Sequence, residues 1–500
     1  MRRLARFVLG LLLVCAALRA LLFCVGAFFR LQTPLEAFNP LESKLVHLAW
    51  RAQHGVQLYP EWRDYPHVAN FFGPVYFLVV GMIGRGVGAS IEGLYTIGRA
   101  VTFTAALLTC LLVAGVLGRR YGRGAAVLGA CMSLGAAPLD GYAVMTRPDV
   151  FAELAGFTGF LLVVGHRVAW AGVGGVVLVL AVMTKQTAGA YVIAAVVALL
   201  AQHRARQALG LALGVGLLLA GILAVIQFRF EPRFVDSLLG ERHCPWSLAA
   251  WGRIMTRLAM IGLELPLLAI AGMILWSRGD SRERSWAALA AVQLPVSLIT
   301  SAKYGADLNY FLGLGIVAAL AAGTLWDAVW RSAAQPCLWQ AGLVALLVAL
   351  LTLESCVSLL QIQRLLQFDV PGYRPSTRRK LLAYQSLFRI ARDPSQRLLT
   401  DSGMIDIRQG ERTVFADPWL FRVLVEAGQI RTAKLVAMID RQEFAMIVTT
   451  HDLFAADYAT YDMGLPMALV ERARARYMPR GSVGGLFVST PRAPETTGGS

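Results

Sequence analysis

Long apolar runs alternate with short polar loops along the first 360 residues. Four of the clearest run from Phe7 to Phe29, from Leu94 to Leu117, from Ala208 to Phe228 and from Leu338 to Ser358. Each is close to the length of about 20 residues that a helix needs to cross the hydrocarbon core of a bilayer. The pattern predicts a mainly α, polytopic membrane helical bundle of about eleven spans.

From about Gln361 the pattern changes, because charged residues become frequent and apolar runs shorten. Short β-like runs alternate there with helical patterns, which predicts a small soluble α/β domain over residues 361–490. The basic amphipathic stretch Thr377 to Arg392 predicts a helix on the membrane surface, with Leu381, Leu382, Phe388 and Ile390 toward lipid or protein. We expect the tail, residues 491–500, to be disordered. The expected strands are Arg397 to Thr400, Thr413 to Ala416, Phe444 to Thr450 and Leu486 to Ser489, and the expected helices are Trp419 to Glu426, Thr432 to Arg441 and Pro466 to Arg476.

Composition supports a membrane protein, because 57% of the residues are hydrophobic and only 16% are charged. The net charge of +16 would suggest nucleic acid in a soluble protein. Here the Arg residues lie mainly in short loops, where they act as a topology signal, so we expect no nucleic acid partner. The seven Cys residues lie mostly inside apolar runs, without the spacing of a disulfide framework or a zinc site.

The positive-inside rule sets the orientation of the chain. Arg2, Arg3 and Arg6 place the N-terminus in the cytoplasm, before an uncleaved first span. The short, glycine-interrupted stretch Phe71 to Gly84 decides the parity of the later loops, that is, the side of the membrane on which each of them lies. If this stretch crosses the membrane, every later loop changes side. If it lies at the outer interface and closes a long outer loop over residues 30–93, the short Arg-rich loops fall inside. The loop over residues 229–257, which carries five Arg residues, and the basic cluster at 378–380 oppose this choice.

With this parity, several polar residues share the outer face of a cell inner (plasma) membrane. Glu42 falls in the first turn of a predicted helix, Asp149 follows Pro148 at the start of a span, and Lys185 interrupts two apolar stretches. Simple alternatives exist for each: a helix-dipole role for Glu42, helix capping for Asp149 and a snorkelling interfacial lysine for Lys185. Asp307, Asn309 and Tyr310 also lie on this side.

Two carboxylates and a cation at a membrane surface suit a reaction on a lipid phosphate. One carboxylate can accept a proton from an acceptor hydroxyl or amine, and the other can orient the acceptor or help to hold a divalent metal. A Lys or Arg can stabilise the phosphate charge as the bond to a sugar breaks.

The ordered set of motifs resembles the GT-C glycosyltransferases, which use polyprenyl-phosphate sugars and include protein O-mannosyltransferases and lipid A aminoarabinose transferases. The segments that carry this resemblance are LESKLVHLAWRAQHGVQLYPEW (41–62), FFGPVYFLVVGMIG (71–84), IGRAVTF (97–103), MTRPDVFAEL (145–154), TKQTAGAYV (184–192) and YGADLNYFLGLG (304–315). The first resembles the family's outer loop with its acidic catalytic residue, and MTRPDVFAEL resembles the second acidic motif.

The resemblance implies inverting transfer of a sugar from undecaprenyl phosphate to a lipid, glycan or protein acceptor. It places Glu42 as general base with Asp149 assisting, Lys185 and Arg147 near the donor phosphate, and Tyr59, Asn309 and Tyr310 at the substrate. The only cofactor that the resemblance suggests is a divalent metal ion. Two departures stand against this pattern: the first motif has a single carboxylate where many relatives have an acidic pair, and Gly313 occupies a position where an acidic residue is expected.

Two other classes of function stay open from the residues alone. A polytopic transporter also carries intramembrane charges, but the chain shows no inverted repeat and its candidate residues lie at one face. A non-catalytic scaffold that presents residues 361–500 would tolerate replacement of Glu42 and Asp149. The histidines of HDLFAADYATYD (451–462) and GERHCPW (240–246) match no strong metal-ligand spacing.

Overall fold

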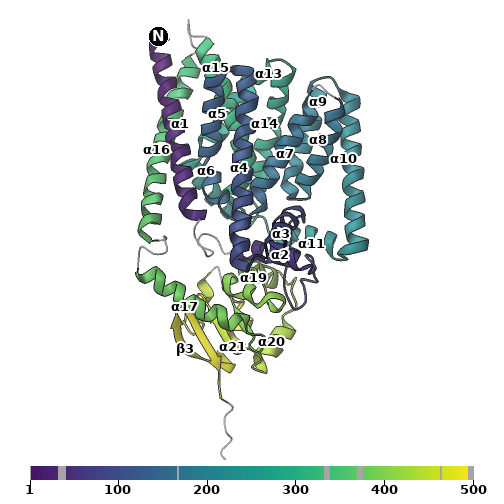
Figure 1. Cartoon of the computed structure of the whole chain (residues 1–500), viewed down its shortest axis with the longest axis vertical. Helices are drawn as coiled ribbons and strands as arrows, with labels where there is room; N and C mark the ends of the chain where they lie inside the picture. Colours follow the sequence, from purple (N-terminus) through teal and green to yellow (C-terminus); the bar gives the residue numbers. More distant parts are fainter. Residues whose placement is uncertain are drawn as a thin grey trace, which may run out of the picture.

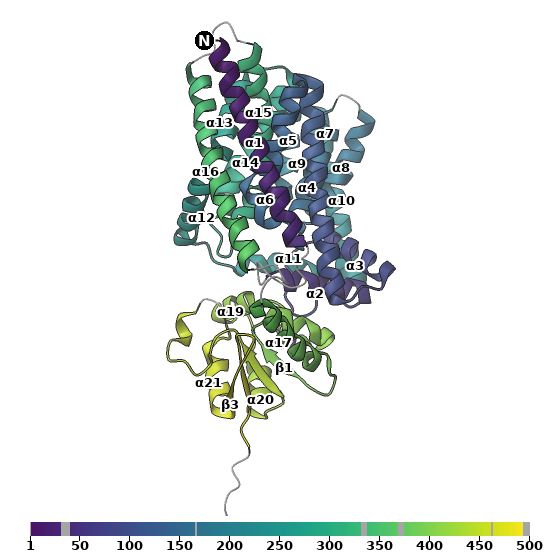
Figure 2. The same ribbon diagram turned by 60° about the vertical axis from the view of Figure 1, so that its left-hand side comes forward.

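The computed structural model consists of a tall helical bundle with a smaller domain below one end of it (Figures 1 and 2). It describes residues 2–31, 41–165, 168–331, 338–368, 375–461 and 464–493. We refer to the end of the bundle next to the smaller, C-terminal domain as the domain end. The tail beyond residue 493 lies outside the described residues, and so does most of the segment that we expected to be disordered.

Most helices of the bundle run along its long axis (Figures 1 and 2). They are α1 (Arg2–Leu31), α4 (Ile91–Tyr121), α5 (Arg123–Gly135), α7 (Pro148–Val164), α8 (Val168–Val182), α9 (Gly189–Ala201), α10 (Ala205–Val225), α13 (Glu264–Ser277), α14 (Ser281–Thr300), α15 (Leu312–Arg331) and α16 (Leu338–Phe368). The remaining elements of this part are α2 (Leu41–His54), α3 (Val75–Val87), α6 (Ala137–Tyr142), η1 (Gln186–Ala188), η2 (Ile226–Phe230), α11 (Phe234–Gly240), η3 (Glu241–His243), α12 (Leu248–Ile261) and η4 (Leu308–Phe311).

The helices confirm a polytopic membrane bundle, although their lengths vary widely. Five described helices are long and apolar enough to cross a membrane, or six if α12 and α13, which are bent by 80°, form one broken span. Others in the bundle are shorter: α5 has 13 residues, α13 has 14 and α7 has 17. At 1.5 Å per residue these helices are only about 20 to 26 Å long. The expected number of about eleven crossings therefore stays a prediction.

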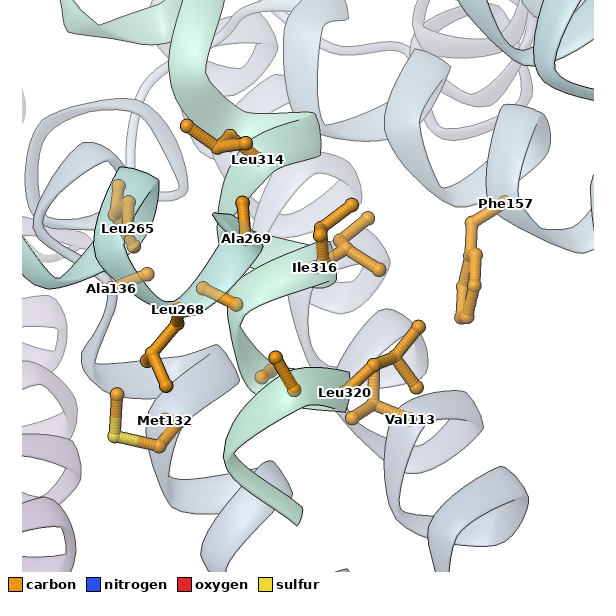
Figure 3. Packing of buried hydrophobic residues seen from close by; sticks show 14 of the residues in the cluster. Val113, Met132, Ala136, Phe157, Leu265, Leu268, Ala269, Leu314, Ile316 and Leu320 are labelled. Atoms are coloured by element: carbon orange, nitrogen blue, oxygen red, sulfur yellow. The ribbon is translucent and has the colours of Figure 1, made fainter. Parts of the chain in front are cut away.

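Helix α15 forms the centre of the bundle. In the segment Leu308–Arg331, which comprises η4 and α15, 94% of the most apolar stretch is buried. A helix that is apolar on all sides is stable only when other helices surround it. Figure 3 shows Leu320 of α15 beside Val113 of α4. Met132 of α5 and Leu268 of α13 lie beside each other in the same hydrophobic cluster. Small residues allow close approach: a Cβ on Gly272 of α13 would lie 2.9 Å from the Cβ of Ala321.

The stretch Phe71 to Gly84, on which the predicted sides of the later loops depend, does not run along the bundle axis. Its helix, α3, has 13 residues and lies beside α2 at the domain end (Figures 1 and 2). The two helices touch closely, because a Cβ on Gly81 would lie 2.7 Å from the Cβ of Ala52. This is the arrangement that the predicted parity of the loops requires.

The C-terminal domain is built on a four-stranded sheet of order β1-β2-β4-β3, which confirms the predicted α/β class. Strand β1 pairs in parallel with β2, and β4 pairs antiparallel with both β2 and β3. The strands are β1 (Leu398–Thr400), β2 (Met446–Thr449), β3 (Tyr477–Val483) and β4 (Leu486–Pro491). The helices are α17 (Pro375–Arg392), α18 (Gly403–Asp406), η5 (Ile407–Arg412), α19 (Pro418–Glu426), α20 (Ala433–Asp440), η6 (Tyr458–Thr460) and α21 (Met467–Arg476).

One expected strand, Thr413 to Ala416, is wrong. The backbone N–H groups of Val414 and Phe415 donate to the carboxylate of Asp406, at 3.1 and 3.0 Å, and Val414 O accepts a hydrogen bond from His67 N. These backbone groups are therefore occupied by partners outside any sheet. Strand β3 was missed because Pro479 and Gly481 interrupt its pattern, where the pairing with β4 shifts its register.

Helix α16 continues past residue 361, the expected domain boundary, as far as Phe368. The next helix, α17, corresponds to the predicted basic amphipathic helix. Its residues Leu387, Phe388 and Ala391 are buried in a cluster with Val448 of the sheet, so this face packs on protein, whereas Leu382 is exposed.

Candidate active site

Asp149 lies at the start of α7 and is the centre of a buried group of charged residues. Pro148 occupies the first helical turn, and Arg147 before it is extended, with φ −144° and ψ 140°. A proline fits this position because its missing N–H would have no partner inside the helix. The turn brings Asp149 into the interior, where it is 2% exposed.

Three side chains donate to the Asp149 carboxylate. Lys185 Nζ and Asn309 Nδ2 both donate to Oδ1, the second at 2.6 Å, and Arg147 Nε donates to Oδ2 at 3.1 Å. Aromatic faces cover both cations: Lys185 Nζ lies 4.7 Å from the ring centre of Tyr310, and the Arg147 guanidinium lies 4.7 Å from that of Tyr142. Burial of charge is costly, and these contacts offset the cost for all three charged groups.

Breaks between helices supply the partners of Asp149. Helix α8 ends at Val182, and Lys185 is extended, with φ −151°, before the short helix η1. Asn309 belongs to η4, which begins where Asp307 accepts a hydrogen bond from Leu308 N at 2.8 Å. The structure thus brings together Asp149, Arg147, Lys185, Asn309 and Tyr310, which the sequence separates by up to 163 positions.

Glu42 lies in the first turn of α2, fully buried at 0% exposure. Arg99 of α4 binds both of its oxygens, with Nε at 2.8 Å from Oε1 and NH2 at 2.7 Å from Oε2. Thr146 N donates to Oε1 at 2.8 Å. The sequence reasoning missed Arg99, although a lone arginine within the apolar run Leu94 to Leu117 is a signal of an intramembrane partner.

The two carboxylates lie at the same end of the bundle, because both contact one short segment, Thr146 to Asp149. Thr102 Oγ1 of α4 donates to Arg147 O at 3.1 Å and fixes this segment. From the residues that the structure describes, each carboxylate accepts three hydrogen bonds, two on one oxygen and one on the other. A carboxylate offers about four lone-pair positions, so these donors leave room for one more on Oε2 of Glu42 and on Oδ2 of Asp149.

Tyr59 contacts a different part of the molecule. Its hydroxyl donates to Phe72 O at 2.7 Å, and its ring packs edge-on against Phe234 with centres 4.7 Å apart. Within the described part of the chain it has no hydrogen bond or ring contact with Asp149 or Lys185. Tyr59 therefore supports the segment before α3, which reaches the Asp149 group through Gln186 Nε2 donating to Phe71 O at 2.7 Å.

A further acid, the half-buried Glu153, follows Asp149 by one turn of α7. Tyr191 of α9 donates to its Oε2 at 2.6 Å. A Cβ on Gly313 would lie 2.9 Å from that same oxygen, so the absence of a side chain at 313 leaves the room that Glu153 occupies. The spacing of four residues after Asp149 on one helix face was the available signal.

The described residues around Glu42 and Asp149 do not fit a divalent metal ion. Both candidate carboxylates already accept three N–H donors, and their nearest charged neighbours are the cations Arg99, Arg147 and Lys185. Among the residues that the structure describes, no group of three or more His, Cys, Asp or Glu side chains could hold a metal. His451, from one of the two histidine segments considered for metal binding, stacks on Tyr461 with ring centres 3.8 Å apart.

No protein-family model and no curated protein matches the sequence. Solved structures match along almost the whole chain. ArnT from Cupriavidus metallidurans bound to undecaprenyl phosphate has a TM-score of 0.55 and 13% identity, over 97% of this chain and 98% of that one. The archaeal oligosaccharyltransferase AglB from Archaeoglobus fulgidus, in complex with an inhibitory peptide and a dolichol-phosphate, has a TM-score of 0.52 and 12% identity, over 98% and 75%. The complex of the Archaeoglobus fulgidus enzyme with Zn and sulfate gives 0.53 and 14%, over 96% and 73%.

This chain has the GT-C fold. The match confirms the predicted fold class and the fold of the family that the motifs resemble. At these identities the matches establish the GT-C fold alone, so the reaction has to be argued from the residues. Within the GT-C fold the Asp149 group lies where the bundle meets the C-terminal domain.

Proposed function

We propose that this protein is a multi-pass membrane glycosyltransferase that moves a sugar from a polyprenyl phosphate to an acceptor at the domain end of the bundle. The observation that carries the proposal is the Asp149 group, in which two cations and an amide donor converge on one buried carboxylate. Two structural neighbours contain undecaprenyl phosphate and a dolichol-phosphate, which supports this class of donor.

Lys185 and Arg147 are the proposed donor phosphate ligands. Both carry hydrogen-bond donors that a phosphate oxygen can share with Asp149, Lys185 as a compact charge and Arg147 as a planar fork. They would stabilise the negative charge that the leaving phosphate gains as its bond to the sugar breaks. Asn309, Tyr310 and Tyr59 are the proposed substrate-binding residues, with Tyr59 acting through the Phe72 segment.

Glu42 is the proposed general base, and Asp149 assists. The acceptor oxygen or nitrogen attacks the anomeric carbon from the face opposite the phosphate, and its proton passes to Oε2 of Glu42, which accepts one hydrogen bond, from Arg99, among the described residues. The bond between the anomeric carbon and the phosphate oxygen breaks, and its electron pair leaves with the polyprenyl phosphate. A single displacement of this kind inverts the anomeric configuration.

The proposal includes an orientation in the membrane. We place the chain in the inner (plasma) membrane, with the domain end, the loop 30–93 and the C-terminal domain extracytoplasmic. We keep the predicted division of the chain into the bundle (residues 1–360), the soluble unit (361–490) and the tail, with the first boundary moved to the end of α16 at Phe368. In support, α2 and α3 lie across the domain end beside α19, as the parity of the Arg-rich loops requires (Figure 1).

The test is transfer by the purified protein in liposomes, with a panel of undecaprenyl-phosphate sugars labelled on the sugar and a membrane extract of lipids, glycans and proteins as the source of the acceptor hydroxyl or amine. Wild type should discharge one of them to undecaprenyl phosphate, whereas Asp149→Asn and Lys185→Met should lose at least about 100-fold in rate. Asp327→Asn is the control, because that carboxylate pairs with Arg331 one turn further along α15, near the end of this helix that is remote from Asn309. Equal rates for wild type and Asp149→Asn would favour the scaffold, and uptake of solute without discharge would favour a transporter.

A further inference from the structure

The first turn of α19, in the C-terminal domain, touches two parts of the bundle that lie far apart in the sequence. Asp417 Oδ2 accepts a hydrogen bond from Lys44 Nζ of α2 at 3.3 Å. Two residues later, the Trp419 ring stacks on Tyr304, with centres 5.5 Å apart and planes 26° apart. Figure 1 shows α19 directly below α2, at the junction of the two domains.

The Asp417 contact leads to Lys185. Asp417 is held in place because its Oδ1 caps α19 by accepting from Leu420 N at 3.0 Å. Lys44 is 3% exposed, and its Nζ lies 5.6 Å from the ring centre of Phe71. Phe71 O accepts from Gln186, the residue after Lys185. The chain of contacts from Asp417 therefore ends beside one donor to Asp149.

The Trp419 contact leads to Asn309. Gly305, next to Tyr304, has φ +85°, and a Cβ there would lie 2.3 Å from the Trp419 ring, so only glycine allows this approach. Three residues separate Gly305 from Asn309, whose Nδ2 donates to Asp149 at 2.6 Å. The second chain of contacts ends on another donor to the same carboxylate.

We infer that residues 417–419 of the C-terminal domain form a clasp that positions Lys185 and Asn309 around Asp149. Asp417 and Trp419 are positioning residues, since they act through Lys44 and Tyr304. The C-terminal domain thereby becomes part of the active-site architecture. Only the ligand-binding readout of this inference rests on the proposed function.

Other contacts hold the domain in place independently of the clasp. Glu92 at the start of α4 pairs with Arg408 and with Arg392, each at 2.8 Å. The N–H of His67 donates to Val414 O at 2.8 Å. Removal of one clasp side chain should therefore leave the C-terminal domain docked while the site becomes less ordered.

The test uses the full-length protein in lipid nanodiscs and the variants Asp417→Asn, Trp419→Ala and Trp419→Phe. Asparagine still caps a helix and phenylalanine still stacks, so neither change should unfold α19. Arg431→Ala is the matched control on the same side of the domain, because this exposed side chain pairs only loosely with Asp64, at 3.6 Å. Two quantities are measured: amide hydrogen exchange, and the affinity for undecaprenyl phosphate as the probe.

Trp419→Ala should raise exchange in residues 303–311 about tenfold and weaken undecaprenyl phosphate binding about tenfold, which corresponds to about 1.4 kcal/mol. Trp419→Phe should restore both values, and Arg431→Ala should change neither. Asp417→Asn should raise exchange in residues 41–51 and 184–189. Exchange in residues 398–400 and 446–449, at the sheet, reports whether the domain stays folded.

The inference is overturned if Trp419→Ala and Asp417→Asn exchange like wild type in those segments, or if Trp419→Phe fails to restore the Trp419→Ala values. If wild type itself does not bind undecaprenyl phosphate, the proposed function fails, while the exchange measurements still decide whether the clasp exists.

Discussion

Arg99 of α4 and Glu42 of α2 form a fully buried, bidentate ion pair, with N···O distances of 2.8 and 2.7 Å. Their side chains are 1% and 0% exposed. A third donor, Thr146 N, joins this pair to the segment that begins α7. The pair therefore has a structural role in fixing the start of α7, whether or not Glu42 also accepts a proton.

The two roles of Glu42 can be separated with a double substitution. Glu42→Leu alone should cost about 3 to 5 kcal/mol of stability, because it removes the carboxylate that balances the buried charge of Arg99. Adding Arg99→Met should recover most of that loss, since an apolar pair of similar volume replaces the ions. Thermal unfolding of the purified variants measures the recovery, and the sugar discharge assay runs on the same samples.

If Glu42 is the base, the double variant should be stable and inactive. Glu42→Gln should also be inactive, since its amide cannot take a proton from the acceptor. A double variant with activity near that of wild type would remove Glu42 from the mechanism and leave it a structural role alone.

Gly98, next to Arg99, offers a second test of how the site is held. A Cβ at this position would lie 2.3 Å from Cγ2 of Thr146. Gly98→Ala should therefore displace the segment from Thr146 to Asp149, with a loss of about 1 to 3 kcal/mol in stability and a lower rate of discharge.

The control for Gly98→Ala lies on the same helix. Gly115→Ala meets nothing within 4 Å, so it should be neutral or slightly stabilising. Thr146→Ala combined with Gly98→Ala removes two of the three clashing atoms and should recover part of the loss. Equal melting temperatures for Gly98→Ala and Gly115→Ala would show that the segment moves freely.

Much of this arrangement was predictable because it depends on periodicity and on the side of each loop. The apolar runs gave the long helices α1, α4, α10 and α16. The Arg-rich loops predicted that Phe71 to Gly84 stays at one face of the membrane, which remains a prediction, and this choice put Asp149 and Lys185 at one end of the bundle. The long helices and the sides of the loops both follow from the partition of each segment between lipid and water, which depends on that segment alone.

The contacts between segments were not predictable in the same way. The pairing of Glu42 with Arg99 depends on the rotation of α2 against α4, which a single sequence does not determine. The failed strand at Thr413 to Ala416 is similar, because the carboxylate of Asp406 takes its backbone donors. Lys44 meets Asp417 only once the C-terminal domain has docked, so no local pattern marks either residue.

His67 should make the docking of the C-terminal domain sensitive to pH. It is 3% exposed, and its ring lies 5.1 Å from that of Phe421 in α19. Burial lowers its pKa to about 4, and the backbone hydrogen bond to Trp62 O opposes the shift only in part. Because the pKa is lower in the folded state, the neutral ring stabilises above about pH 6.5, and this stability is lost as pH falls toward 4.

The measurement is the difference in unfolding free energy between wild type and His67→Phe at pH 7.5 and at pH 5. The difference should shift by about 2 kcal/mol in favour of the variant at pH 5. A comparison between variants is needed because burial raises the pKa of Asp401 and Asp406 to about 7, which changes stability with the opposite sign. A constant difference across this range would show that His67 does not titrate on unfolding.

The proposed orientation predicts the side of the membrane from which a thiol reagent can label each end of α4. Ser90 caps the start of α4 and Arg123 follows its end, and both are exposed. In a background without other cysteines, Ser90→Cys should react with a membrane-impermeant maleimide added to intact spheroplasts, and Arg123→Cys should react only after lysis. The reverse result would mean that α3 crosses the membrane or that the N-terminus lies outside. In either case the Asp149 group would face the cytoplasm, and a donor sugar presented on the opposite side could not reach it.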